Sequence, residues 1–104
     1  MPDPTLEKMV GLFRQLQAEV DASVLRTGGY WSETETWNHV IEELGEMART
    51  YRTTRPRPEH EHQAEMCDVL FTLLVIANIR KYDLGVAFTE CLRKLDNLAP
   101  KPPT

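Results

Sequence analysis

Apolar side chains recur at helical spacing in four segments of the chain, and turn-forming residues separate these segments. Because an α-helix repeats every 3.6 residues, apolar positions three and four apart lie on one face and indicate an amphipathic helix. No segment alternates apolar and polar residues between hairpin turns, as strands of a sheet do. The pattern therefore predicts an all-α fold, a four-helix bundle of antiparallel neighbours.

The first two predicted helices have clear boundaries. Thr5 can cap the first helix, and Gly28 and Gly29 end it. Ser32 and Glu35 form a capping box at the start of the second helix. The expected core positions are Leu6, Met9, Val10, Phe13, Leu16, Val20 and Val24 in the first helix, and Trp37, Val40, Ile41, Leu44, Ala48 and Tyr51 in the second.

A proline-containing segment, residues 53–58, ends the second helix. The third helix is expected from residue 58 or 59 to about residue 82. From Met66 to Ile79 it is apolar on every side, which predicts a central helix covered all round. Asp83 can cap the fourth helix. The apolar positions of that helix are Leu84, Ala87, Phe88, Cys91, Leu92, Leu95 and Leu98.

The chain is short enough to form one small domain, which we expect over residues 1–104, with flexible ends at 1–4 and 99–104. A domain of this size leaves part of its apolar surface uncovered. A second copy would help to cover that surface, and we therefore expect a homodimer or a homotetramer.

Charge and composition narrow the class of protein. The net charge of -4 disfavours a nucleic-acid partner, because phosphate binding requires a basic surface. The apolar run from Val69 to Ala77 is shorter than the roughly 18 residues that a membrane span requires, and no signal peptide is recognisable. Cys67 and Cys91 lie in apolar helical segments without CxxC spacing, so we expect reduced core cysteines. These features predict a cytoplasmic protein without a membrane partner.

Two acidic pairs stand out in the second and third helices. Glu43 with Glu46, and Glu65 with Asp68, are each three residues apart and share a helix face. A solvated surface is the simplest interpretation of either pair alone, since a like-charge pair costs only about 0.2–0.5 kcal/mol there. Asp68, however, interrupts the most apolar helix, where an unpaired carboxylate is costly. This residue favours a functional interpretation.

Four carboxylates brought together would need a counter-charge. Two of them about 4 Å apart repel by roughly 4 kcal/mol at an effective dielectric constant near 20. No Lys or Arg occupies the acidic stripe of either helix. Oxygen ligands suit Mg2+ or Mn2+ better than zinc, and bound Mg2+ often completes its shell with substrate phosphates. The pattern therefore predicts a magnesium site, with Mn2+ possible, for a ligand that carries phosphate.

The spacing of these acids, EExxE at 42–46, an 18-residue spacer and ExxD at 65–68, resembles the MazG-like all-α nucleoside triphosphate pyrophosphohydrolases. The resemblance extends over Ser32 to Asn97. It implies hydrolysis of a nucleoside or deoxynucleoside triphosphate to the monophosphate and pyrophosphate, in housecleaning of the nucleotide pool. It also implies that Glu43 orients or deprotonates the attacking water. The magnesium ligands that it implies are Glu43, Glu46, Glu65 and Asp68.

Members of that family hold phosphate and sugar with a lysine and an asparagine on the last helix. Here Asn97 is four residues from Arg93 and three from Lys94, so both basic residues are candidates. An arginine-rich tail of some relatives is replaced by a proline-rich ending, which leaves the phosphate contacts open. Trp31 is a candidate to stack on a nucleobase, and His39, on the acidic edge, could contact base or phosphate.

Two other classes of protein remain as alternatives. The acids could be surface residues of a dimeric helical interaction module without activity. The segment from Glu59 to His62 contains an ExxH motif, and paired ExxH motifs are typical of di-iron carboxylate bundles. The chain has only one such motif.

Overall fold

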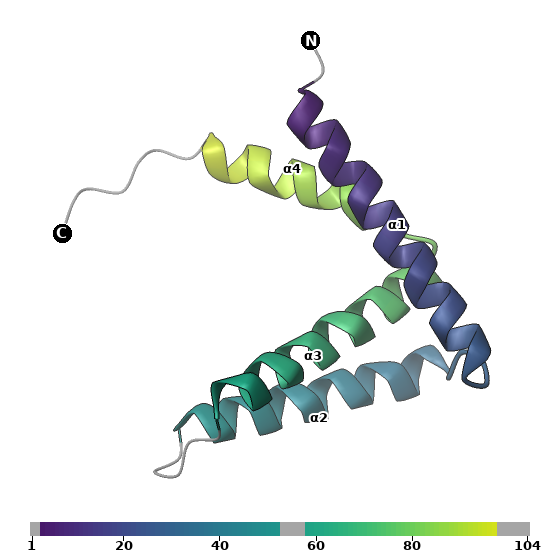
Figure 1. Cartoon of the computed structure of the whole chain (residues 1–104), viewed down its shortest axis with the longest axis vertical. Helices are drawn as coiled ribbons and strands as arrows, with labels where there is room; N and C mark the ends of the chain where they lie inside the picture. Colours follow the sequence, from purple (N-terminus) through teal and green to yellow (C-terminus); the bar gives the residue numbers. More distant parts are fainter. Residues whose placement is uncertain (1–2, 53–57, 98–104) are drawn as a thin grey trace, which may run out of the picture. The chain divides into compact units, whose positions relative to one another are not determined.

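The computed structural model describes residues 3–52 and 58–97, which form α-helices joined by turns and contain no strand (Figure 1). The all-α prediction is confirmed. The elements are α1 (Pro4–Arg26), α2 (Glu33–Arg52), α3 (Glu59–Ile79) and α4 (Leu84–Asp96). Of the expected flexible ends, Pro4 already belongs to α1, whereas residues 1–2 and 99–104 lie outside the described part, as do residues 53–57 of the predicted loop.

The chain divides into two compact units. The central unit is Gln17–Tyr82 and contains the end of α1, all of α2 and all of α3. The terminal unit combines Met1–Leu16 with Asp83–Thr104, and so contains the start of α1 and all of α4. Each unit is described below by itself.

Local capping explains where α1 and α2 begin. The Oδ1 atom of Asp3 accepts the backbone N–H of Thr5 at 2.8 Å, so Asp3 takes the capping role that the sequence suggested for Thr5. The Oγ atom of Ser32 accepts the backbone N–H of Glu35 at 3.1 Å, as a capping box requires. The predicted start of α2 is therefore confirmed.

In the central unit, α2 lies beside α3 and runs in the opposite direction (Figure 1). The edge of α2 that faces α3 is not the predicted apolar stripe. Thr36 and Val40 are buried on this edge, and Glu43, Met47 and Thr50 continue it as half-buried residues. Their spacing of three and four residues keeps all five on one side of the helix.

The prediction that the bulky stripe of α2 forms the core is therefore wrong for all but Val40. The helix is turned so that small or polar side chains meet α3, and the large side chains of the predicted stripe stay exposed, including Tyr51, which nevertheless stacks on His62 of α3. The prediction that α3 is covered all round is also wrong, because large apolar side chains of α3 are exposed too. The exposed fractions are 41% for Trp37, 64% for Ile41, 43% for Leu44 and 49% for Tyr51 on α2, and 54% for Met66, 51% for Leu70, 42% for Phe71 and 39% for Leu73 on α3.

The C-terminal half of α3 carries most of the core of the central unit. Its buried apolar residues are Val69, Leu74, Val75, Ile76 and Ala77. By length and composition α3 is apolar enough to cross a membrane, a test that the core helices of soluble proteins also pass. The expectation concerned the run from Val69 to Ala77 alone, and α3 is longer because it also includes polar and charged residues beside that run.

Polar contacts join the end of α1 to α3. The side-chain amide of Asn78 donates to the backbone oxygen of Gln17 at 2.9 Å, and the side-chain amide of Gln17 donates to the Oδ1 atom of Asn78 at 3.1 Å. Val20 and Val24, one and two turns further along α1, are buried. The polar pair therefore fixes the position of α1 along α3 while the valines supply the apolar contact.

Side-chain contacts join α2 to α3 at both ends of the helix pair. Near the connection between the helices, the ring of Tyr51 stacks on the buried ring of His62, with centroids 4.1 Å apart. At the other end, Arg80 binds Glu33 with two hydrogen bonds, from Nε at 2.9 Å and from a terminal nitrogen at 2.7 Å. Such a two-bond pair restricts orientation as well as distance, so it fixes the start of α2 against the end of α3.

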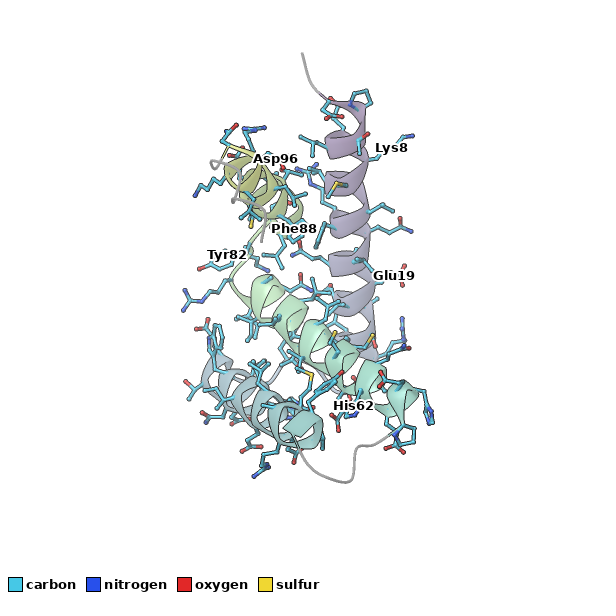
Figure 2. All side chains as sticks on the ribbon, turned by 90° about the vertical axis from the view of Figure 1, so that its left-hand side faces the viewer. Lys8, Glu19, His62, Tyr82, Phe88 and Asp96 are labelled. Atoms are coloured by element: carbon cyan, nitrogen blue, oxygen red, sulfur yellow. The ribbon has the colours of Figure 1, made fainter. Side chains whose placement is uncertain are left out.

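In the terminal unit, α1 and α4 approach closely at a glycine. A Cβ atom placed on Gly85 would lie 2.8 Å from the backbone oxygen of Val10. The rings of Phe13 and Phe88 are 5.3 Å apart at their centroids, and Figure 2 shows Phe88 on the side of α4 toward α1. Gly85 is therefore required by the close approach of the two helices.

Asp83 caps α4 as predicted, since its Oδ1 atom accepts the backbone N–H of Val86 at 3.1 Å. Hydrogen bonding from Arg14 lowers the pKa of Asp83, and the capping bond adds to this effect. Phe88 and Leu95 are exposed, so the predicted apolar stripe of α4 is only partly covered.

The two cysteines do not belong to the core. Cys67 on α3 and Cys91 on α4 are both free thiols, as predicted, but both are exposed. The expectation of core cysteines is wrong because each lies on the outer side of its helix.

We predict that Gly85→Ala destabilises the protein by about 1–3 kcal/mol, because the added methyl group would meet backbone that cannot move aside. Gly11→Ala is the matched control. Nothing lies within 4 Å of a Cβ at Gly11, and the change should raise stability by about 0.5–1 kcal/mol, as alanine in a helix does. Thermal unfolding measures both, and equal effects would refute the close approach.

We predict that the Arg80–Glu33 pair contributes stability that depends on pH. Hydrogen bonding from Arg80 lowers the pKa of Glu33 from its ordinary value of 4.5. The unfolded chain therefore binds this proton more readily than the folded chain, and the contribution is complete above about pH 4.5 and is lost as the pH falls through the lower, folded pKa. The melting temperatures of wild type and Glu33→Gln should converge in this range. A difference that stays constant down to about pH 3 would contradict the assignment.

Candidate functional site

A pocket of about 340 Å³ opens in the central unit between α2, α3 and the turn that follows α1. This is within the range of roughly 300–1,000 Å³ that small-molecule sites occupy. The end of α1 supplies Val24, the turn supplies Thr27, Gly29, Tyr30 and Trp31, α2 supplies Thr36, His39 and Glu43, and α3 supplies Asp68, Phe71, Thr72 and Val75.

The turn after α1 is shaped by two glycines. Gly28 and Gly29 have φ angles of 115° and 96°, which side chains with a Cβ rarely adopt. The backbone N–H of Gly29 donates to the oxygen of Val24 at 2.9 Å and completes the end of the helix. This turn carries Tyr30 and Trp31 to the rim of the pocket.

Tyr30 is held in place by its hydroxyl group, which donates to the Oδ1 atom of Asp21. Partial burial raises the pKa of Tyr30, and the hydrogen bond to Asp21 raises it further. The phenol therefore stays neutral near physiological pH, and its hydrogen is engaged with Asp21.

Glu43 and Asp68 bring carboxylates from the two facing helices to the same pocket. The side chain of Glu43 is 22% exposed, and its Oε1 atom lies 3.2 Å from the Nε2 atom of His39, one turn earlier on α2. Thus Glu43 sits at the helix interface with an imidazole that can orient it.

Asp68 differs from the sequence expectation in its surroundings. It is an exposed residue, so the inference that burial alone makes its charge costly is wrong. Asp68 lines the pocket together with Glu43 of α2 and is exposed there. The position of Asp68 opposite α2, and not its burial, makes it a candidate site residue.

The other two predicted metal ligands lie beside this pocket and do not line it. Glu46 borders a separate depression of α2 together with Glu42 and Arg49. The Oε2 atom of Glu65 lies 3.4 Å from the hydroxyl of Thr50. Within residues 3–52 and 58–97, no three His, Cys, Asp or Glu side chains converge closely enough to hold a metal ion. The site with four carboxylate ligands therefore stays a prediction.

Trp31 and His39 form the aromatic side of the pocket. The Trp31 side chain is 61% exposed, and its ring meets that of His39 edge to face, with centroids 5.8 Å apart. An exposed indole on a pocket rim offers a flat apolar surface to a ligand. The location of both predicted residues in the pocket with Glu43 is consistent with the substrate-binding roles expected for them.

Three threonine hydroxyls line the pocket, and each donates its hydrogen to the backbone of its own helix. The bonds are 3.0 Å from Thr27 to the oxygen of Ser23, 2.8 Å from Thr36 to that of Ser32 and 2.9 Å from Thr72 to that of Asp68. The sequence pattern did not identify Thr36 as a pocket residue. The signal for Thr36 was its spacing of three and seven residues from His39 and Glu43.

The predicted residues of the last helix belong to the terminal unit. Arg93 binds Glu90 on the surface of α4 at 2.7 Å, and Asn97 is the residue that ends the helix. Lys94 is exposed on the same helix. The pocket described above is formed by the central unit, so the contacts proposed for Arg93, Lys94 and Asn97 with substrate stay predictions.

Comparison with models of protein families matches residues 32–101 to the model described as the MazG nucleotide pyrophosphohydrolase domain. The matched segment covers more than half of the chain and contains both helices that face each other across the pocket. No curated protein and no solved structure gives a match.

Proposed function

Because the chain belongs to the MazG nucleotide pyrophosphohydrolase family, we propose that it hydrolyses a nucleoside or deoxynucleoside triphosphate to the monophosphate and pyrophosphate. Housecleaning of the nucleotide pool is the proposed role. The observation that carries the proposal is the pocket in which Glu43 and Asp68 come together from facing helices, next to exposed aromatic surface. One end of this pocket suits a metal–phosphate group and the other suits a flat base.

Mg2+ is the proposed cofactor, with Mn2+ as a substitute. The donor set supports this choice, because hard carboxylate oxygens suit these ions, and Mg2+ often uses one or two carboxylates plus phosphate oxygens. Glu43 and Asp68 would hold the ion, and Glu46 and Glu65, one turn away on the same helices, would complete the set. A bound divalent ion neutralises the triphosphate and acidifies bound water.

Glu43 is the proposed general base. Its carboxylate accepts a proton from the attacking water, and the bond between the α- and β-phosphoryl groups breaks to release pyrophosphate. The 3.2 Å contact with His39 restrains the rotation of Glu43 and keeps one oxygen directed along α2. Positioning of this kind matters because phosphoryl transfer depends mainly on orientation and charge stabilisation.

The base, the sugar and the remaining phosphates of the nucleotide would be bound by other residues of the chain. Trp31 would stack on the base, and His39 would contact its edge or a phosphate. Arg93 or Lys94, together with Asn97, would hold phosphate and sugar. The support for Trp31 is its exposed indole on the pocket rim. The support for the residues of α4 is their fit to the pattern of the family.

A homodimer or homotetramer is the proposed assembly. Support comes from the large apolar side chains that α2 and α3 leave exposed, since patches of this kind mark interaction surfaces. We also propose a cytoplasmic location without nucleic-acid or membrane partners, in line with the net charge of -4. The same apolar surface would serve an inactive interaction module, which the assay below distinguishes.

The di-iron alternative has less support. Its ExxH motif includes His62, which is 2% exposed and stacked on Tyr51. The Nδ1 atom of this histidine has no hydrogen-bond partner in the part of the chain that the structure describes. A ring enclosed in this way faces an aromatic side chain, whereas a di-iron ligand faces other carboxylates and histidines.

We predict that the protein with Mg2+ releases pyrophosphate, and not orthophosphate, from at least one natural or damaged nucleoside triphosphate. Chelation of the metal should abolish turnover, and Mg2+ should restore it. Glu43→Gln and Asp68→Asn should each lower kcat/KM by about a hundredfold or more, the usual contribution of a positioned acid or base. A coupled assay for pyrophosphate measures these rates.

Glu42→Gln is the matched control, because Glu42 neighbours Glu43 on α2 but lies outside the pocket. It should retain most of the activity. If Glu42→Gln lost as much activity as Glu43→Gln, the site would be wrongly placed. No turnover on the whole panel, together with no effect of Mg2+ on stability, would favour the interaction module.

We predict that Ile41→Glu shifts the protein to monomers. Ile41 is 64% exposed in the single chain, so a charge there should disturb only contacts with another copy. Asn38→Glu is the matched control, since it adds the same charge to an exposed position of α2 outside the apolar stripe. Light scattering after gel filtration measures the mass. A wild-type monomer, or equal behaviour of both variants, would contradict the assembly through this surface.

A further inference from the structure

We propose that Thr36 and Thr72 select nucleobases that carry an exocyclic amino group over bases that present a keto oxygen at the same place. The inference deepens the proposed function and rests on it, because it takes the ligand of the pocket to be a nucleotide. It names the class of base, which neither the family match nor the acidic residues specify.

The argument begins with the hydrogens of the two hydroxyl groups. A threonine hydroxyl has one hydrogen to donate and two lone pairs that accept. Thr36 donates to the oxygen of Ser32 at 2.8 Å, and Thr72 donates to the oxygen of Asp68 at 2.9 Å. Among residues 3–52 and 58–97, no group donates a hydrogen bond to either hydroxyl oxygen. Both residues line the pocket, and their hydroxyl oxygens keep lone pairs that can accept a hydrogen bond.

The two threonines are also deeply buried, although they line a pocket. Thr36 is 3% exposed and Thr72 is 6% exposed. Because bulk water has little access to these two residues, the hydrogen bonds that their free lone pairs accept must come from a ligand in the pocket. A ligand group that cannot donate leaves these lone pairs unused, and a keto oxygen would place a further acceptor against them.

The other polar side chains of the pocket wall are also mainly hydrogen-bond acceptors. The hydroxyls of Thr27 and Tyr30 also donate to protein oxygens, and ionised carboxylates only accept. Among residues 3–52 and 58–97, no Lys or Arg lines this pocket, and the side-chain donors left are the Trp31 indole N–H and the His39 imidazole. A wall rich in acceptors requires a ligand that brings donors.

A nucleobase is the part of the nucleotide that fits beside these threonines. Phe71 and Val75 lie on α3 on either side of Thr72, and Trp31 lies on the rim. These side chains suit the flat apolar faces of a base, whereas the phosphates belong with Glu43 and Asp68. An exocyclic amino group has two hydrogens that it can donate to acceptors such as the threonine oxygens.

A keto base is disfavoured because its oxygen would face two acceptors. To donate to that oxygen, a threonine must rotate and give up its bond to the helix backbone. The loss of one such bond corresponds to roughly a threefold to tenfold change in affinity. Cytosine and uracil provide the comparison, since C4 carries an amino group in cytosine and a keto oxygen in uracil, and N3 changes with it from an acceptor to an N–H donor.

The test compares dCTP with dUTP in the pyrophosphate assay. Wild type should prefer dCTP in kcat/KM by roughly tenfold. Thr36→Val and Thr72→Val keep the branched shape and remove the hydroxyl, and each should bring the ratio toward one, while Thr36→Ser should keep it. Thr89→Val is the matched control, because Thr89 is an equally buried threonine of α4 whose hydroxyl donates to the backbone of Val86. It should leave the ratio unchanged.

Calorimetric binding of dCMP and dUMP separates this inference from the proposed function. Turnover without preference between dCTP and dUTP would overturn the inference and leave the function standing. Tighter binding of dCMP without turnover of any triphosphate would refute the function and support the base-selective pocket. Equal binding of both monophosphates would overturn the inference. The inference would also be overturned if the valine variants changed the kcat/KM ratio of CTP to dCTP instead of the ratio of dCTP to dUTP. The threonines would then contact the sugar and not the base.

Discussion

The packing of α2 against α3 along a narrow edge of small and polar residues is the constraint on which the central unit depends. Thr36 and Val40 are short enough to let the helices approach, and Glu43 follows one turn later on the same edge. If the helix were turned to bury Ile41 instead, Glu43 would move away from Asp68. The contact that holds the helices together thus also determines which carboxylate faces the pocket.

Features that depend on neighbouring residues could be predicted from the sequence. The start of α2 at Ser32 and the cap of α4 at Asp83 are confirmed, because a short side chain reaches only the nearest backbone groups. Asn78 satisfies a backbone oxygen, as polar residues inside a core usually do. The cap of α1 was misplaced because Asp3 and Thr5 are both good caps, and only geometry distinguishes them.

Features that depend on a partner surface could not be predicted in the same way. Periodicity shows that Trp37 and Ile41 share an apolar face, but it does not show whether α3 or another chain covers that face. The same uncertainty affected Asp68 and Cys67, which were placed in a core because their helix is apolar. Asp68 is nevertheless at the pocket, since its position along α3 was correct even though its burial was not. Helix register was therefore a better guide to the site than expected burial.

The glycine turn after α1 has a consequence for how this protein can diverge. Gly28 and Gly29 set the path of the backbone without side-chain contacts, as a Cβ at either position would meet nothing within 4 Å. Trp31 follows this turn and precedes α2, and its side chain is 61% exposed, with an edge-to-face contact to His39 of α2. Mutations at position 31 therefore alter the ligand surface with little effect on folding. If the pocket binds a nucleotide as proposed, substitution at position 31 is a way to change the substrate range without altering the helices that carry Glu43 and Asp68.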